Sequence, residues 1–177
     1  MATLQERIIG SLRLEAKTFE EVEADQSATT QAFIVVVLAA VASGIGSIRA
    51  GFGVVGISLV AAIVGWVVWS LLTFVIGTKV LPEKDTHADL GQMLRVLGFA
   101  QAPGLFSVLG IIPILGWLVR FAVFVWMLAA VVVAVRQALD YTSTGRAVLV
   151  CVIGWVVYMV LMMMFSGMAF FGAAMAR

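Results

Sequence analysis

Long stretches without a charged residue make up most of this 177-residue chain. They run through residues 26–48, 50–78, 96–119, 121–135 and 147–176. A helix rises about 1.5 Å per residue, so roughly 20 apolar residues cross a hydrocarbon layer about 30 Å thick. The pattern therefore predicts an all-α, multi-pass membrane protein.

We predict five transmembrane helices from these stretches, at about residues 31–48, 57–78, 89–109, 114–139 and 147–170. The glycine-rich segment 51–56 is expected to be a loop before the second helix. Proline weakens a helix interior but is tolerated at a helix start. We therefore expect a kink at Pro103–Gly104 in the third helix, then a turn at Gly110–Pro113 before the fourth.

The distribution of Lys and Arg orients these helices. With the N-terminus inside, eight of the eleven lie on the cytoplasmic side. The other three are Arg49, Arg120 and Arg177. Because cytoplasmic loops are enriched in Lys and Arg, we expect a cytoplasmic N-terminus and a C-terminus on the opposite side.

Residues 1–29 are predicted to form a cytoplasmic amphipathic head, and residues 30–177 a five-helix membrane domain. Apolar residues recur at helical spacing in the head, and Arg7 lies among the polar residues of the opposite side. Such a helix either lies in the membrane interface or docks on the cytoplasmic loops. The acidic run 20–25 is expected to be a solvated linker. Thr86 is expected to cap a second amphipathic stretch at the start of the third helix.

Several segments carry a family resemblance. They are RLEAKTFEEVEAD (13–25), LLTFVIGTKVL (71–81), LGFAQAPGL (97–105), IPILGWLV (112–119), AVRQALDY (134–141) and TGRA (144–147). With these residues the chain resembles the Yip1 family of five-span membrane proteins, in its compact bacterial form. It departs from the family pattern at Glu15–Ala16, where Asp-Pro is usual, and at Gln26, where proline is common.

The resemblance implies a location in the bacterial inner membrane and a role based on contacts. Eukaryotic relatives act in vesicle traffic, bind small GTPases and associate with one another in the membrane. Only about thirty residues precede the first span here, too few for a folded recognition domain. A small GTPase is therefore not expected as a partner, whereas the lipid bilayer, other membrane proteins or self-association are.

Composition narrows the function further. Hydrophobic residues make up 63% of the chain, and the net charge of +1 gives no basic field for nucleic acid. The single cysteine, Cys151, and the single histidine, His87, supply neither a cysteine-based metal site nor a catalytic constellation. No nucleotide-binding or hydrolase motif is present. We expect no enzymatic activity, no cofactor and no metal.

Four polar residues in or near the spans, together with one proline, are candidate contacts. Next to Pro103, Gln101 either donates to a carbonyl freed by the proline or contacts a substrate or ion. Arg120 is expected to anchor the fourth helix at the outer surface, or to bind a lipid phosphate or a partner carboxylate. Arg136 and Asp140 are four residues apart, and Arg136 is expected to bind a headgroup or to cap carbonyls of the loop between the second and third spans.

Small residues supply candidate packing faces. Ala42-x-x-x-Gly46 in the first span and Gly98-x-x-x-Ala102 in the third have the spacing that lets helix backbones approach closely in lipid. The sequence leaves open whether these faces meet within one chain or between chains.

The function predicted from all this is that of a non-enzymatic membrane-organising, accessory or trafficking-type protein that works through protein or lipid contacts. The alternative is a small oligomeric transporter or channel centred on the kinked third helix.

Overall fold

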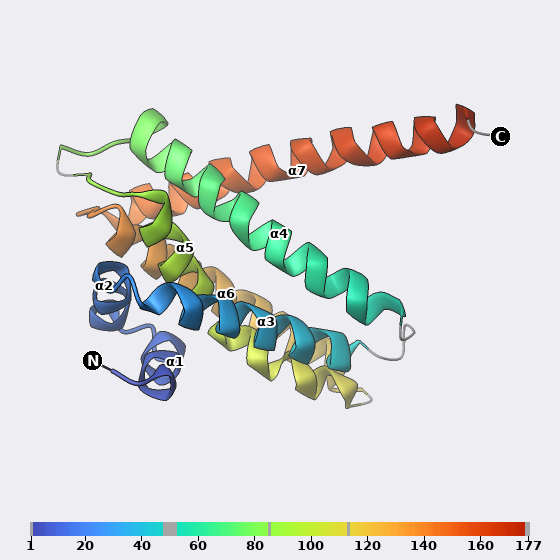
Figure 1. Ribbon diagram of the computed structural model, residues 1–177, viewed down its shortest axis with the longest axis horizontal. Coiled ribbons are helices and arrows are strands. Elements are labelled where there is room, and N and C mark those ends of the chain that lie inside the picture. Colours follow the sequence, from blue (N-terminus) through green and yellow to red (C-terminus); the bar gives the residue numbers. More distant parts are fainter. Residues whose placement is uncertain (1, 48–52, 85, 113, 176–177) are drawn as a thin grey trace.

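The computed structural model describes residues 2–47, 53–84, 86–112 and 114–175, with the side chains of 53–58 and 165–175 left undescribed. Within these residues every regular element is a helix (Figure 1). In chain order they are α1 (Leu4–Leu12), α2 (Ala16–Ala24), α3 (Ala28–Gly46), α4 (Gly53–Val75), the π-helix η2 (Ile76–Val80), α5 (Leu90–Phe99), the 3-10 helix η3 (Ala102–Ile111), α6 (Gly116–Ala138) and α7 (Thr144–Met175). The all-α prediction is confirmed.

Five helical stretches in the described residues are long and apolar enough to span a membrane, as predicted. They are Ala28–Gly46, Leu59–Val80, Leu90–Ile111, Gly116–Ala138 and Thr144–Met164. The second span belongs to α4, which begins at Gly53. Residues 53–56 of the glycine-rich segment are therefore helical, and the prediction of a loop at these residues is wrong. Glycine is more acceptable in a membrane helix than in a soluble one, because lipid offers the backbone no alternative hydrogen-bond partners.

The third span changes helix type in its middle, close to the position of the predicted kink. The α-helix ends at Phe99, and the chain continues from Ala102 as a 3-10 helix with Pro103 in its first turn. Proline has no N–H to donate to the fourth residue before it, so the α-helical ladder stops there and tighter bonds take over. Asp89, not the expected Thr86, caps the start of this span: its side chain accepts from the Gln92 N–H at 2.8 Å.

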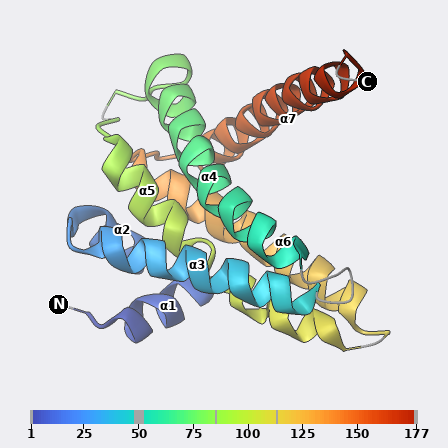
Figure 2. The same ribbon diagram turned by 45° about the vertical axis from the view of Figure 1, so that its right-hand side comes forward.

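The first and third spans form the centre of the bundle. Half of the third span is buried, and 44% of the first, against 17% of the fifth. The remaining spans cover this pair, and α7 diverges from the other spans toward its C-terminal end in both views (Figures 1 and 2).

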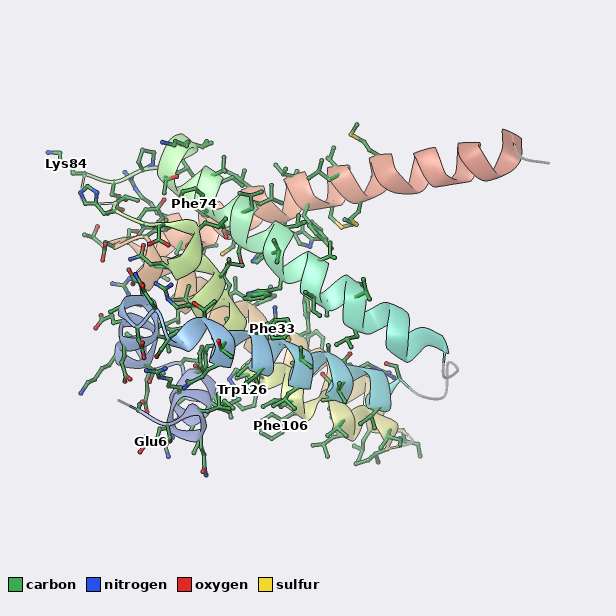
Figure 3. All side chains as sticks on the ribbon, in the orientation of Figure 1. Glu6, Phe33, Phe74, Lys84, Phe106 and Trp126 are labelled. Atoms are coloured by element: carbon green, nitrogen blue, oxygen red, sulfur yellow. The ribbon has the colours of Figure 1, made fainter. Side chains whose placement is uncertain are left out.

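The head packs against the end of the bundle where α3 and α5 begin (Figure 1). Phe19 and Val22 of α2 are fully buried in the hydrophobic core, and Leu4, Ile8 and Leu12 of α1 pack against that core. The Trp126 indole N–H donates to the Leu12 carbonyl at 2.9 Å, and its ring stacks on Phe106 (Figure 3). Of the two sequence interpretations, docking on the rest of the chain is the one that the contacts support.

Candidate functional site

The small-residue faces meet within the chain. A Cβ added at Gly98 would lie 2.7 Å from the Ala32 Cβ, and one added at Gly104 would lie 3.0 Å from the Ala39 Cβ. At Gly46 an added Cβ would collide with the Ser107 carbonyl oxygen. Close approach of this kind needs small residues on both helices, so α3 lies directly on α5 and η3. This answers the question that the sequence left open.

Pro103 is buried at the start of η3, and Gln101 stands just before it with its side chain half-buried. The backbone near this junction is satisfied locally, since the Gln101 N–H donates to Gly98 O and the Gly104 N–H donates to Gln101 O. Within the described residues the Gln101 carboxamide itself has no hydrogen-bond partner. It therefore does not bond the freed carbonyl, and instead it lines a cavity.

This cavity lies between the spans and has a volume of about 830 Å³. Residues from α3, α4, η3, α6, α7 and the junction at Gln101 line it, so it touches all five spans. Its volume falls within the range of about 300–1,000 Å³ that is typical of small-molecule sites. We call it the lateral cavity, because its mouth opens sideways between α6 and α7.

The mouth is marked by residues that line the cavity and are still about half exposed. Phe124 and Leu128 of α6 are 56% and 50% exposed, and Val152 and Trp155 of α7 are 52% and 56% exposed. These residues lie well inside their spans, so in a bilayer they face acyl chains rather than water. A lipid chain or a neighbouring helix can therefore reach the cavity without leaving the membrane.

The cavity wall is apolar except for a few neutral polar groups. Ser43, Gln101, Ser107 and the Tyr158 hydroxyl are on it, together with three tryptophan rings, and the lining contains no Asp, Glu, Lys, Arg or His. The only titratable side chains on this wall are the Cys151 thiol and the Tyr158 phenol, so no carboxylate, imidazole or ammonium group faces the cavity. The arrangement suits the binding of an uncharged, largely hydrocarbon ligand.

Arg120 is exposed on α6 and folds back toward the start of its own helix. Its guanidinium Nη2 lies 3.6 Å from where a Cβ at Gly116 would stand, and its Cγ 3.8 Å from the corresponding point at Gly110. No described residue forms a salt bridge or hydrogen bond with it. This direction agrees with anchoring at the membrane surface and leaves the charge free for a lipid phosphate.

Arg136 holds the connection between α6 and α7. Its guanidinium donates to the Tyr141 and Thr142 carbonyls at 3.2 and 3.3 Å and to the Thr144 hydroxyl at 3.2 Å. It thus caps carbonyls, as expected, but those of the loop that follows it rather than of the loop between the second and third spans. Asp140 has a φ of 51° just past the end of the helix and forms no ion pair with Arg136, so among the described side chains the pairing suggested by their spacing is absent.

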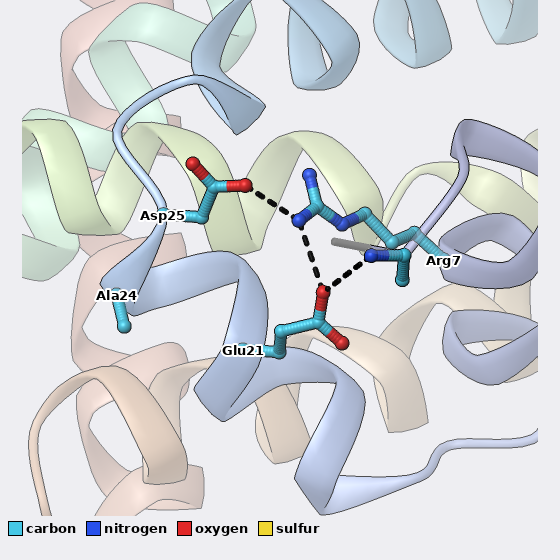
Figure 4. Close-up of a pocket in the computed structure, with 5 residues that line it drawn as sticks. Arg7, Glu21, Ala24 and Asp25 are labelled. Atoms are coloured by element: carbon cyan, nitrogen blue, oxygen red, sulfur yellow. Dashed lines mark hydrogen bonds and ion pairs between the residues drawn. The ribbon is translucent and has the colours of Figure 1, made fainter.

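An ion cluster in the head was missed by the sequence interpretation (Figure 4). The Arg7 guanidinium donates to Glu21 at 3.0 Å, Asp25 at 2.6 Å and Gln31 at 3.0 Å, and its side chain is 1% exposed. Hydrogen bonds from Ser27 and then from Arg7 lower the pKa of Asp25 to about 2. Arg7 therefore joins the head to the start of the first span, and the acidic run is not a solvated linker.

The rest of the acidic run contacts the third and fourth spans. Glu20 accepts from the Gln137 amide at 2.6 Å and Glu23 from the Gln92 amide at 3.0 Å. The Arg95 guanidinium, 6% exposed as a residue, donates to the Glu23 backbone carbonyl. Burial and then the negative charge of Asp140 raise the pKa of Glu23 to about 7. These polar contacts attach α2 to the third and fourth spans.

Titratable side chains elsewhere in the described residues form no group of three that could hold a metal ion. Glu83 instead joins two loops: it accepts from the Thr142 N–H and hydroxyl and pairs with Arg146 at 3.3 Å. Tyr141 adds a hydroxyl bond of 2.6 Å to the Leu81 carbonyl. These groups hold the ends of α4, α6 and α7 together, so their hydrogen bonds and charges are satisfied by other parts of the same chain.

Comparison with known proteins agrees with this architecture. A family model described as the Yip1 domain matches residues 9–165. No curated protein matches the chain, and no solved structure does. The matched range includes most of the head and all five spans. Because the family model covers most of the chain, this protein belongs to the Yip1 domain family of membrane proteins.

Proposed function

We propose that this protein is a non-enzymatic membrane-organising or accessory protein, and that it acts by binding lipid or another membrane protein at the lateral cavity. The single observation that carries the proposal is the cavity mouth between α6 and α7, half-exposed at Val152 and Trp155 and wholly apolar in character. Such a mouth in the bilayer core is accessible only to molecules that are themselves in the membrane.

The use of the charged residues supports a role without catalysis. Arg7, Arg95 and Arg136 each donate to several acceptors within the chain. General acid–base chemistry relies most often on His, Asp, Glu or Lys facing a site where substrate can sit, and the cavity wall carries none of these residues. We accordingly propose that binding, rather than turnover, is what this fold provides.

The proposed setting is the bacterial inner membrane, with the N-terminus and the head (1–29) in the cytoplasm and the C-terminus of the membrane domain (30–177) on the opposite side. The positive-inside rule supports this orientation. The partners we propose are lipids, other membrane proteins or further copies of this chain. Neither nucleic acid nor a small GTPase is proposed, because the net charge is +1 and the head is docked on the bundle.

Site-specific photo-crosslinking tests the proposal. A photoreactive residue is placed at Val152, on the mouth, or at Val160, which is 51% exposed on the same helix but does not line the cavity. After crosslinking at native expression level and extraction in mild detergent, adducts are identified by mass spectrometry. We expect a defined lipid or membrane-protein adduct at position 152 alone. Identical, unselective adduct patterns at both positions would contradict the proposal.

A transporter or channel is the second candidate, and one observation favours it: the Gln101 carboxamide faces the cavity at mid-span. An oligomer could align several such cavities around a polar path. Reconstitution into liposomes separates the two functions. Ion or solute flux that Gln101→Leu abolishes would favour transport, whereas a stoichiometric partner without flux favours the accessory role.

A further inference from the structure

The hydroxyl and carboxamide side chains of the second span and of the cavity wall differ in how their hydrogen bonds are satisfied. Ser70, Thr73 and Thr78 on the second span donate to carbonyls of their own helix at 2.8 Å, which is how hydroxyls are normally satisfied in lipid. On the cavity wall, by contrast, Gln101 and Ser43 have no hydrogen-bond partner among the described residues, and neither does the Ser107 hydroxyl. Three unpaired polar side chains from the first and third spans are thus brought together at the lateral cavity.

The unpaired carboxamide lies deep in the membrane. Gln101 is at the middle of the third span, Leu90–Ile111, at the junction between α5 and η3. A carboxamide has two donors and an acceptor, and leaving them unmet in an apolar environment costs free energy. A ligand that brings its own hydrogen-bonding group to this depth would remove that cost.

The wall also restricts the charge of the ligand. Its lining has no cationic side chain to neutralise a phosphate, and transfer of a charged headgroup into an apolar cavity is strongly unfavourable. The acyl chain of a phospholipid fits the wall but carries no polar atom at mid-depth. A neutral lipid has an uncharged head that can sink below the interface, together with a long chain for the aromatic and aliphatic walls.

We propose that the lateral cavity binds a neutral lipid, one that combines a long hydrocarbon chain with an uncharged carbonyl or hydroxyl head, and that Gln101 hydrogen-bonds this head. This inference rests on the proposed function, since it names the ligand class of the same cavity. The chain leaves the cavity through the mouth between α6 and α7, where Trp155 and Leu128 flank it.

Two matched lipid probes test the ligand class. One is a diacylglycerol with a diazirine in one acyl chain, and the other is a phosphatidylglycerol with the same labelled chain. Each is incorporated into vesicles with the purified protein, irradiated, and located by peptide mass spectrometry. We expect the diacylglycerol to label the cavity-lining part of α7, residues 151–159, and the phosphatidylglycerol to label the outer faces of the spans.

Gly65→Phe blocks the cavity for this test. A Cβ added at Gly65 meets nothing closer than the Tyr158 hydroxyl at 3.7 Å, so a larger side chain enters the cavity with little collision. Val64→Phe is the matched control, because Val64 is the neighbouring residue, is 54% exposed and does not line the cavity. We expect Gly65→Phe to abolish diacylglycerol labelling and Val64→Phe to leave it unchanged.

Gln101→Leu tests the hydrogen bond between Gln101 and the lipid head separately from the space that the cavity offers the lipid. Loss of about one hydrogen bond corresponds to roughly tenfold weaker labelling by the diacylglycerol, with phosphatidylglycerol labelling unchanged. Equal labelling of residues 151–159 by both probes would overturn the preference for a neutral lipid while leaving the proposed function intact. Labelling insensitive to Gly65→Phe, or crosslinks only between copies of this chain, would overturn the cavity as the lipid site.

Discussion

Arg7 shows how a single residue can hold a charge inside a hydrophobic fold. Its guanidinium is 1% exposed and donates to two carboxylates and one carboxamide from α2, the α2–α3 turn and α3. Helical periodicity assigns Arg7 correctly to the polar side of α1, but it cannot say that another segment of the chain covers that side. The acidic run at residues 20–25 could have indicated the partners of Arg7. Its four carboxylates lie within six residues, and carboxylates that are not in water need positive charges beside them.

Arg7→Ala is expected to loosen the head. It removes the shared donor of Glu21 and Asp25 and should lower the free energy of unfolding by about 2–4 kcal/mol, as for other buried ion clusters that lose one partner. Thermal unfolding in detergent and trypsin cleavage of the head measure this. Arg13→Ala on the same helix is the control, because Arg13 is 71% exposed and lies 3.7 Å from its only partner in the described chain, Glu15. Equal effects of the two variants would contradict the role given to Arg7.

Glu23 makes the attachment of the head dependent on pH. Burial and Asp140 raise its pKa from 4.5 to about 7, with Glu20 and Asp89 adding to the effect and Arg95 opposing it. The folded state therefore holds a proton that the unfolded chain has lost between about pH 4.5 and 7. Stability conferred by this group is full at the low end of that window and is lost as pH rises through 7.

We expect the thermal midpoint to fall between pH 5.5 and 8 by a few degrees. Asp25 stays ionised throughout this window, because its pKa is about 2, and does not contribute. Glu23→Gln keeps an uncharged side chain at every pH and should flatten the profile. A pH profile that is unchanged in Glu23→Gln would assign the dependence to another group.

At the scale of elements, the contact between α3 and the third span depends on small residues at the crossing points. Gly98 lies on Ala32, and Gly46 on the Ser107 carbonyl. The change from α-helix to 3-10 helix at Pro103 keeps the third span continuous and buried although proline interrupts the ladder. The spacing of small residues predicted close packing, whereas the identity of the partner helix depended on how the chain folds back on itself.

The same substitution at two glycines should have opposite effects. Gly98→Ala brings a methyl group to 2.7 Å from the Ala32 Cβ and is expected to destabilise the bundle by about 1–3 kcal/mol. At Gly65 an added Cβ meets only the Tyr158 hydroxyl, at an ordinary contact distance of 3.7 Å, and Gly65→Ala replaces a glycine inside a helix, so it should be neutral or stabilise by up to about 1 kcal/mol. Unfolding midpoints in one detergent measure both. Similar destabilisation by the two variants would show that the α3 contact is less tight than described.

At the scale of the whole molecule, the head and the loops around Glu83 and Arg146 all lie at one end of the bundle, and the turn between η3 and α6 lies at the other (Figures 1 and 3). This polarity matches the proposed orientation, because the end with the head also carries most of the Lys and Arg. In the proposed orientation the end with the head faces the cytoplasm, and the end with the turn between η3 and α6 faces the opposite side.

Cysteine labelling checks this orientation. In a Cys151→Ala background, Lys84→Cys, on an exposed loop side chain, should react with a membrane-impermeant maleimide only after the cells are permeabilised (Figure 3). Ile114→Cys, at a position 90% exposed in the turn before α6, should react in intact cells. The reverse pattern would place the head outside the cell.

Fold class, the five spans and the family could all be predicted from the sequence, because the length of an uninterrupted apolar stretch decides whether a helix can cross a bilayer. Tertiary structure decided what Arg7, Gln101 and Arg136 contact. Burial, pairing and the shape of the lateral cavity depend on which helix covers which face, and periodicity along one helix does not contain that information. The lipid-facing surface and the internal packing surfaces are both apolar, so only the folded chain separates them.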